Sequence, residues 1–173
     1  GDTVTLYGPL TVNAGCTFTL HNNSSLLQNS TAGNTGNIVV KRDTPALMRL
    51  DYVMWSSPVV GQTLLPFSPM TMTNRFYTYN PSTNLYVALT APDATSFATG
   101  SGYLIRMPNN HPTTPTVWNG TFTGAPTNGT VNLNVTSGLY HAIGNPYPSA
   151  IDADDFIAAN GITEALYFWR KTN

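Results

Sequence analysis

Three aspartates stand close together near the C-terminal end of the sequence, at Asp152, Asp154 and Asp155. Closely spaced carboxylates supply the hard oxygen ligands that Ca²⁺ prefers. The spacing lacks the glycine and the distal glutamate of an EF-hand loop, whereas acidic side chains in the first turn of a helix are stabilised by the helix dipole. We therefore expect these aspartates to begin a helix, with a calcium site as the alternative, and we expect no other cofactor.

Aromatic side chains form the second group that could do chemistry. The nine Tyr and three Trp outnumber the seven Phe, and Tyr and Trp combine an apolar ring with a polar edge. Sugar rings present a matching partner, so Tyr77, Tyr79 and Tyr86, or alternatively Trp118, are the candidates for a glycan-binding platform. Alternating aromatics in strands more often fill a core or form cross-strand pairs, and the pattern alone favours that interpretation.

Residues suited to catalysis are sparse and scattered. The three histidines, His21, His111 and His141, have none of the short spacings of a zinc site. No nucleophile elbow or phosphate-binding loop is present, and no pair of carboxylates is suggested for glycoside hydrolysis. The lone Cys16 precedes an expected strand, so we interpret it as a buried structural thiol. The sequence predicts a protein that is not an enzyme.

Charged side chains make up only 9% of the chain, against roughly 25% in an ordinary soluble domain. Its 26 Thr, 18 Asn and 11 Ser supply about a third of the residues instead, and the net charge is −1. This balance excludes partners that need phosphate neutralisation, which are nucleic acids and anionic membranes. No apolar run is long enough for membrane insertion. A surface rich in Thr, Asn and Ser with one cysteine indicates an extracellular or bacterial cell-surface location.

Residues 1–42 contain short apolar pairs separated by Gly, Pro and Asn turns. The pairs recur at intervals close to those of a parallel β-solenoid, although the intervals are irregular. We expect two or three solenoid-like coils here, with an antiparallel meander as the alternative.

Residues 43–173 carry turn signals about every ten residues, which is typical of a β-sandwich or jelly roll. A hairpin is predicted across the turn at 80–84. A helix is predicted over about 150–160, with Ser149 as its N-cap. The fold class is therefore all-β with one short helix, in one compact domain cut from a larger protein. The strands are expected at 47–55, 75–79, 85–89, 102–107, 117–122, 131–135, 140–143 and 165–169.

Several stretches together resemble a domain of Bacteroidetes (Flavobacteria-type) cell-surface proteins that are exported by the type IX secretion system. The most specific of them is the Asn-Pro-Tyr-Pro-Ser segment at 145–149, whose two prolines also predict a rigid corner before the helix. The resemblance implies a β-rich architecture and a role in adhesion, surface layers or glycan capture, and it carries over no catalytic residues. The stretches are 36–42, 50–59, 75–80, 102–106, 143–152 and 166–169.

These observations predict a non-enzymatic extracellular module with an adhesive, structural or filament-forming role. A carbohydrate-binding module is the alternative. The expected partners are glycans or neighbouring domains of surface proteins, and the strand at 165–169 would allow self-association by strand addition.

Overall fold

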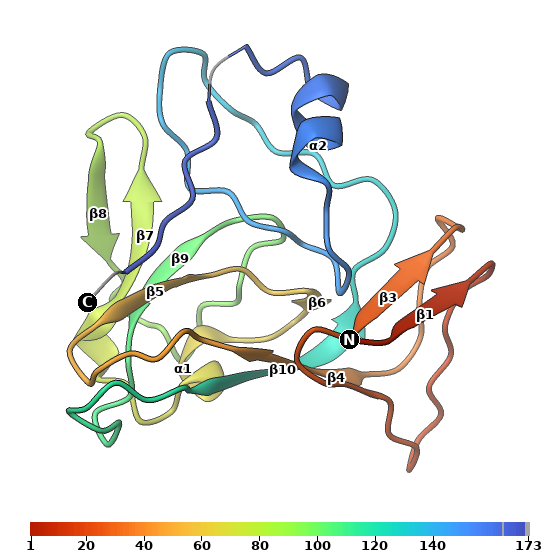
Figure 1. Cartoon of the computed structure of the whole chain (residues 1–173), viewed down its shortest axis with the longest axis horizontal. Coiled ribbons are helices and arrows are strands. Elements are labelled where there is room, and N and C mark those ends of the chain that lie inside the picture. The colour runs from red at the N-terminus through yellow and green to blue at the C-terminus, as the bar shows by residue number, and fades with distance from the viewer. Residues whose placement is uncertain (164, 172–173) are drawn as a thin grey trace.

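The computed structural model describes residues 1–163 and 165–171. The chain folds into short strands with few helical turns, as the sequence predicts, and its arrangement is shown in Figure 1. The elements in chain order are β1 (Thr3–Leu6), β2 (Thr19–Leu20), β3 (Ser25–Gln28), β4 (Ile38–Asp43), β5 (Tyr52–Trp55), β6 (Val59–Val60), α1 (Leu64–Phe67), the 3₁₀ turn η1 (Thr73–Arg75), β7 (Phe76–Asn80), β8 (Leu85–Ala88), β9 (Tyr103–Arg106), β10 (Asn119–Pro126) and α2 (Ala153–Ala159).

The N-terminal strands pair in parallel, so that each coil of the chain stacks on the previous coil. β1 pairs with β3 and β2 pairs with β4, and an isolated parallel bridge joins Thr11 to Thr35 between them. Partners that lie 20 to 24 residues apart in parallel are successive coils of a solenoid. The solenoid-like interpretation is confirmed, and the antiparallel meander is excluded.

Strand β4 joins these coils to the first four-stranded sheet, whose order is β2-β4-β10-β6. The side chains of β10 alternate between a buried face and an exposed face. Gly120, Phe122 and Gly124 are buried, whereas Thr121 and Thr123 between them are exposed. Its antiparallel register with β4 places Phe122 opposite Val40, so both side chains face the core.

The second sheet is antiparallel, with the order β5-β9-β7-β8. The predicted hairpin is confirmed by β7 and β8, which place Tyr79 opposite Tyr86. Asn84 closes the turn with a φ of 55°, a conformation that asparagine tolerates better than most residues. The predicted strand at 102–107 is confirmed as β9.

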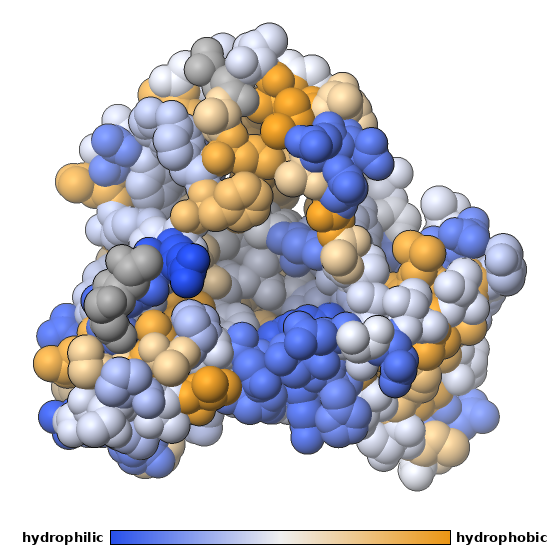
Figure 2. Space-filling model, in the orientation of Figure 1, coloured by the Kyte–Doolittle hydropathy of each residue, from blue (hydrophilic) through white to orange (hydrophobic). Residues whose placement is uncertain are grey.

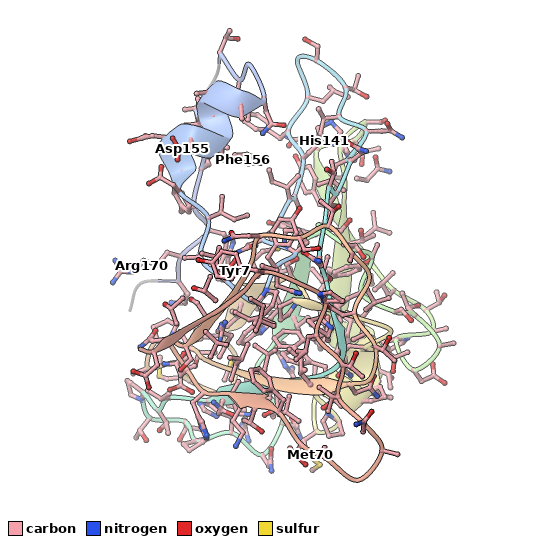
Figure 3. The ribbon with its side chains drawn as sticks, turned by 90° about the vertical axis from the view of Figure 1, so that its right-hand side faces the viewer. Tyr7, Met70, His141, Asp155, Phe156 and Arg170 are labelled. Carbon is pink, nitrogen blue, oxygen red and sulfur yellow. The ribbon has the colours of Figure 1, made fainter. Side chains whose placement is uncertain are left out.

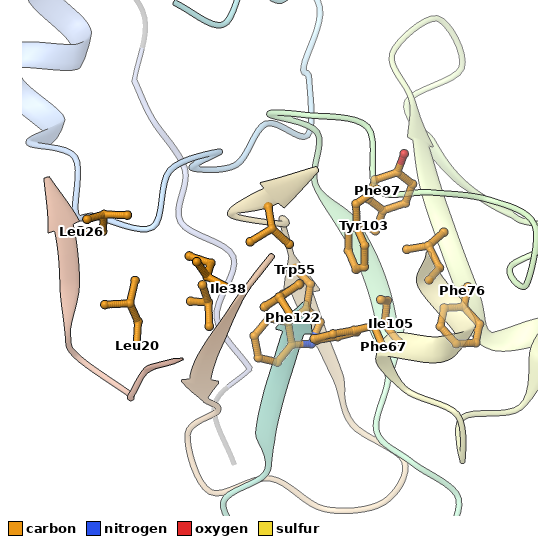
Figure 4. Close-up of a cluster of buried hydrophobic side chains, with 13 residues drawn as sticks. Leu20, Leu26, Ile38, Trp55, Phe67, Phe76, Phe97, Tyr103, Ile105 and Phe122 are labelled. Atoms are coloured by element: carbon orange, nitrogen blue, oxygen red, sulfur yellow. The ribbon is translucent and has the colours of Figure 1, made fainter. Parts of the chain in front are cut away.

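The two sheets face each other across an aromatic core (Figure 4). Phe122 from the first sheet and Trp55 from the second have ring centroids 5.8 Å apart, and Phe67 of α1 stacks on Phe122 at 4.3 Å. Leu20 and Leu26 of the coils belong to the same cluster. Burial of these large rings is the main favourable term in such a fold, and it makes the arrangement a sandwich, as expected.

Several predicted strands are wrong. Residues 131–135 form no strand, and residues 140–143 contribute only a single bridge from Ile143 to Ser101. The long strand expected at 47–55 is shortened to β5, because Met48 and Asp51 close a turn through two mutual hydrogen bonds. Residues 165–169 are also not a strand, and Tyr167 and Phe168 are 77% and 79% exposed. In the part of the chain that the structure describes, residues 131–135 and 165–169 have no neighbouring strand with which to pair.

Cys16 is exposed, so its assignment as a buried thiol is wrong. It ends a tight turn in which its N–H donates to the Asn13 carbonyl at 3.0 Å, and Gly15 has a φ of 80°. A residue in such a turn projects from the coil instead of entering the core.

Helix α2 lies within the predicted range, although it begins at Ala153. Its N-cap is Asp152, so the assignment of Ser149 as the cap is wrong. In the part of the chain that the structure describes, no helix is both long enough and apolar enough to cross a membrane.

Replacing Gly120 by alanine is expected to destabilise the fold, because the added Cβ would lie 2.8 Å from the Trp55 ring and 2.9 Å from the Phe67 ring. Overpacking of a core in this way costs about 1–3 kcal/mol. Urea denaturation measures the difference. Gly33→Ala is the control, since a Cβ there meets nothing within 4 Å. Equal stability of the two variants would contradict this account of the core.

Candidate binding face

The outer face of the second sheet carries a group of tyrosines. Phe76 points into the core, so the alternation of β7 turns Tyr77 and Tyr79 to the other side. Tyr79 and its cross-strand partner Tyr86 have ring centroids 5.4 Å apart, and Tyr52 of β5 lies 5.9 Å from Tyr77. We call these four residues the tyrosine face. It contains three of the four residues that the sequence suggested for glycan binding.

Tyr52 was missed by sequence reasoning. It falls in the apolar stretch that is predicted as a strand at 47–55, and only the register of β5 on β9 reveals that it shares a face with the tyrosines of β7. Its partner across the strand pair is Arg106. No local signal in the sequence marks this position.

Polar groups hold the rings in place. The Tyr79 hydroxyl donates to the Asn84 side-chain oxygen, and Arg75 donates from Nη1 to the Tyr77 hydroxyl at 3.2 Å. Burial raises the pKa of Tyr52, and hydrogen bonding to Tyr77 adds to this effect. Burial also raises the pKa of Tyr86, helped by the proximity of Tyr79. These hydroxyls therefore stay protonated at neutral pH and can both donate and accept.

Trp118, the fourth suggested residue, lies elsewhere. Its ring centroid is 5.8 Å from that of Trp55 and 5.5 Å from that of Phe67, in edge-on contacts at the margin of the core. Its backbone N–H donates to Thr44 Oγ1 at 2.9 Å. Trp118 is half-buried and does not share a face with the tyrosines.

A cavity of about 1580 Å³ lies against one end of the tyrosine face. Its lining includes the rings of Tyr79, Tyr86, Tyr140, Tyr167 and Trp169. Tyr140 and Tyr167 contact each other edge-on, with centroids 5.9 Å apart. Figure 2 shows the hollow in the middle of the molecule, with apolar surface gathered above it and polar surface below. The cavity is therefore lined by aromatic rings from β7 and β8 and from the C-terminal part of the chain.

The C-terminal part of the chain forms the upper boundary of this cavity. Figure 3 shows α2, with Asp155 and Phe156, and the loop that carries His141 rising side by side above the body of the molecule. The His141 Nε2 accepts a hydrogen bond from the Thr136 backbone N–H at 2.9 Å, which closes that loop. His111 is buried, and its Nε2 lies 2.9 Å from the Leu47 carbonyl. Both histidines have structural partners.

The segment at 145–149 forms the rigid corner that its prolines predict. Asn145 accepts a hydrogen bond from the Tyr147 N–H at 2.9 Å, and the Tyr147 hydroxyl donates to the Gly129 carbonyl at 2.7 Å. The Pro148 carbonyl accepts from the Leu26 N–H at 3.0 Å. The first two bonds brace the corner itself, and the bond to Leu26 ties it to the N-terminal coils.

The three aspartates lie at the start of α2. Oδ1 of Asp152 accepts hydrogen bonds from the N–H groups of Asp154 at 2.9 Å and Asp155 at 3.1 Å. This is an N-cap, and the other two carboxylates occupy the first turn, where the helix dipole favours them. Within residues 1–163 and 165–171 no group of three or more His, Cys, Asp or Glu is placed to hold a metal ion. Calcium binding stays a prediction.

The fold and its exposed aromatic face define a β-sandwich module with N-terminal solenoid-like coils. The chain belongs to a family described as a domain of unknown function (DUF8693), whose model matches residues 1–173. No curated protein and no solved structure matches the chain.

Replacing Asp152 by alanine is expected to weaken α2 by about 1 kcal/mol, because two backbone N–H groups lose their acceptor. Since none of the residues of α2 is buried, the loss would be local, and hydrogen exchange of the α2 amides measures it. Asp152→Asn preserves the acceptor and serves as the control. Equal protection in Asp152→Ala and the unmodified protein would disprove the capping role.

Proposed function

We propose that this domain is a non-enzymatic extracellular module that binds carbohydrate on the tyrosine face and serves adhesion at a bacterial cell surface. The observation that supports binding is the convergence of Tyr77, Tyr79 and Tyr86 on one exposed sheet face beside the cavity. The surface location is supported by the low charge of the chain and by its resemblance to type IX secreted proteins.

The chemistry of the face suits sugars. A tyrosine ring covers the apolar C–H face of a sugar, while its hydroxyl and a nearby amide such as Asn84 bond to sugar hydroxyls at the edge. Rings of this kind are rigid and lose little conformational entropy on binding. The cavity is larger than the roughly 300–1,000 Å³ of ordinary small-molecule pockets, so it suits an oligosaccharide better than a single sugar.

Removing a tyrosine ring is expected to weaken glycan binding. Tyr79→Ala and Tyr86→Ala should each lower affinity about tenfold, equivalent to about 1.4 kcal/mol, because each variant loses a stacking surface. A glycan array would identify the ligand, and calorimetric titration would measure its affinity.

Tyr7→Ala is the matched control, because Tyr7 is 83% exposed on the N-terminal coils and lies outside the tyrosine face. Binding to no glycan on the array would refute the proposed function. So would equal losses in all three variants.

A structural or filament role is the second candidate, and strand β8 supports it. All four residues of β8 are exposed at the edge of its sheet, and none of them is charged or a proline. Such an unprotected edge favours pairing with a strand of another molecule. Strand addition is thus better supported at β8 than at residues 165–169, where it was expected.

Introducing a charge on this edge is expected to block self-association. Leu85 is 62% exposed, so Leu85→Lys should leave the fold intact and shift any dimer or filament towards monomer. Sedimentation velocity at increasing concentration measures the change. Leu50→Lys is the control, since Leu50 is 65% exposed outside β8. A chain that is monomeric at all concentrations would rule out this second candidate.

A further inference from the structure

Two arginines adjoin one end of the tyrosine face. Arg106 lies directly opposite Tyr52 in the pairing of β9 with β5. Arg75 immediately precedes β7, and its bond to the Tyr77 hydroxyl places its guanidinium on the same side of the sheet. Arg75 and Arg106 both act electrostatically on Tyr52, so the two cations and two tyrosine hydroxyls form one group, which we call the arginine end of the face.

Arg106 is buried, at only 7% exposed, and within residues 1–163 and 165–171 no carboxylate lies within ion-pair distance of it. Among the same residues its Nε has no hydrogen-bond partner, and its Nη2 reaches the Asn109 side-chain oxygen at a long 3.4 Å. Buried charges in proteins are almost always paired, because desolvation is costly. In the described residues the Asp51 carboxylate pairs with Lys171 at 3.7 Å, and no carboxylate pairs with Arg75 or Arg106, so the arginine end has an uncompensated positive charge there.

Arg75 supplies the accessible part of this charge. One of its donors is engaged by Tyr77, and a guanidinium has five N–H donors in a planar fork that matches a carboxylate or a sulfate. Contact with Tyr77, together with the nearby Tyr52, raises the pKa of Arg75. The tyrosine hydroxyls beside it can donate to the same anion. The arginine end is therefore built to receive a negative group.

We propose that the carbohydrate bound by this face is anionic, with a carboxylate or sulfate group at Arg75 and the hydroxyls of Tyr52 and Tyr77, and sugar rings on Tyr79 and Tyr86. Arg106, on the same face of the sheet as its cross-strand partner Tyr52, adds positive potential. This inference rests on the proposed function. The guanidinium of Arg75 lies at the Tyr77 hydroxyl, and Tyr77 and Tyr79 are two residues apart on β7, roughly 7 Å at about 3.3 Å per residue. The anionic group and the stacked rings therefore belong to neighbouring sugar units of one chain.

The test is a panel of oligosaccharide pairs. Each acidic member, for example tetragalacturonate or a sulfated galactan fragment, is compared with its methyl-esterified or desulfated form, which keeps the rings and loses the charge. We expect at least tenfold tighter binding of an acidic member over its neutral form, and this preference should shrink with added salt. The carboxylate and sulfate arms show which anion is bound.

Single substitutions test whether the preference for the acidic ligand depends on Arg75. Arg75→Gln should reduce affinity for the acidic ligand at least tenfold and so abolish its preference over the neutral form. Arg75→Lys should retain part of the preference, because it keeps the charge and loses the fork. Lys41→Gln, on β4 of the other sheet, makes the same change in net charge and is the control.

The two proposals fail in different ways. Equal binding of acidic and neutral forms that still depends on Tyr79 would overturn the anionic inference and leave the carbohydrate module standing. An acidic preference that is unchanged in Arg75→Gln would overturn the assignment to the arginine end. No binding to any member of the panel would overturn both proposals.

Discussion

The aromatic contact between the two sheets is the constraint on which the rest of the structure depends. Phe122 and Gly120 of β10 meet Trp55 and Phe67 in the core, and only a glycine leaves room for the two rings. Because side chains alternate along a strand, the residues that this contact draws inward determine which residues face outward. The tyrosine face is thus a consequence of the core packing on the opposite side of the same sheet.

Because charged side chains make up only 9% of the chain, each of them can be examined for a structural or binding role. Threonines cover the outward positions of β10, and they keep the surface polar without ion pairs. In this chain several charged side chains have local structural partners. Asp152 caps a helix, and Arg42 donates to backbone carbonyls, including that of Ser24 at 3.0 Å. Arg75 and Arg106 instead share one sheet face with Tyr52 and Tyr77, and in the residues that the structure describes no carboxylate lies within ion-pair distance of either.

Predictions from sequence succeeded where the pattern was local. The hairpin of β7 and β8 needs only alternation and a turn of Asn, Pro and Ser, and the parallel coils need only short apolar pairs at solenoid spacing. Predictions failed at 131–135 and 165–169, where apolar residues are just as frequent. A strand also requires a partner strand for its backbone N–H and C=O groups. The sequence of the segment does not reveal whether such a partner lies beside it.

The sequence by itself determined the class of fold, the hairpin and the fact that Tyr77, Tyr79 and Tyr86 lie on one side of a sheet, because alternation and turn chemistry act between near neighbours. Tertiary structure decided that this is the side of the sheet that faces away from the core. It brought in Tyr52 and Arg106 through strand pairing across more than 50 residues, and it withdrew Trp118 into the margin of the core. Register and packing between distant segments set these outcomes, since burial of the large aromatic rings outweighs the preferences of any single strand.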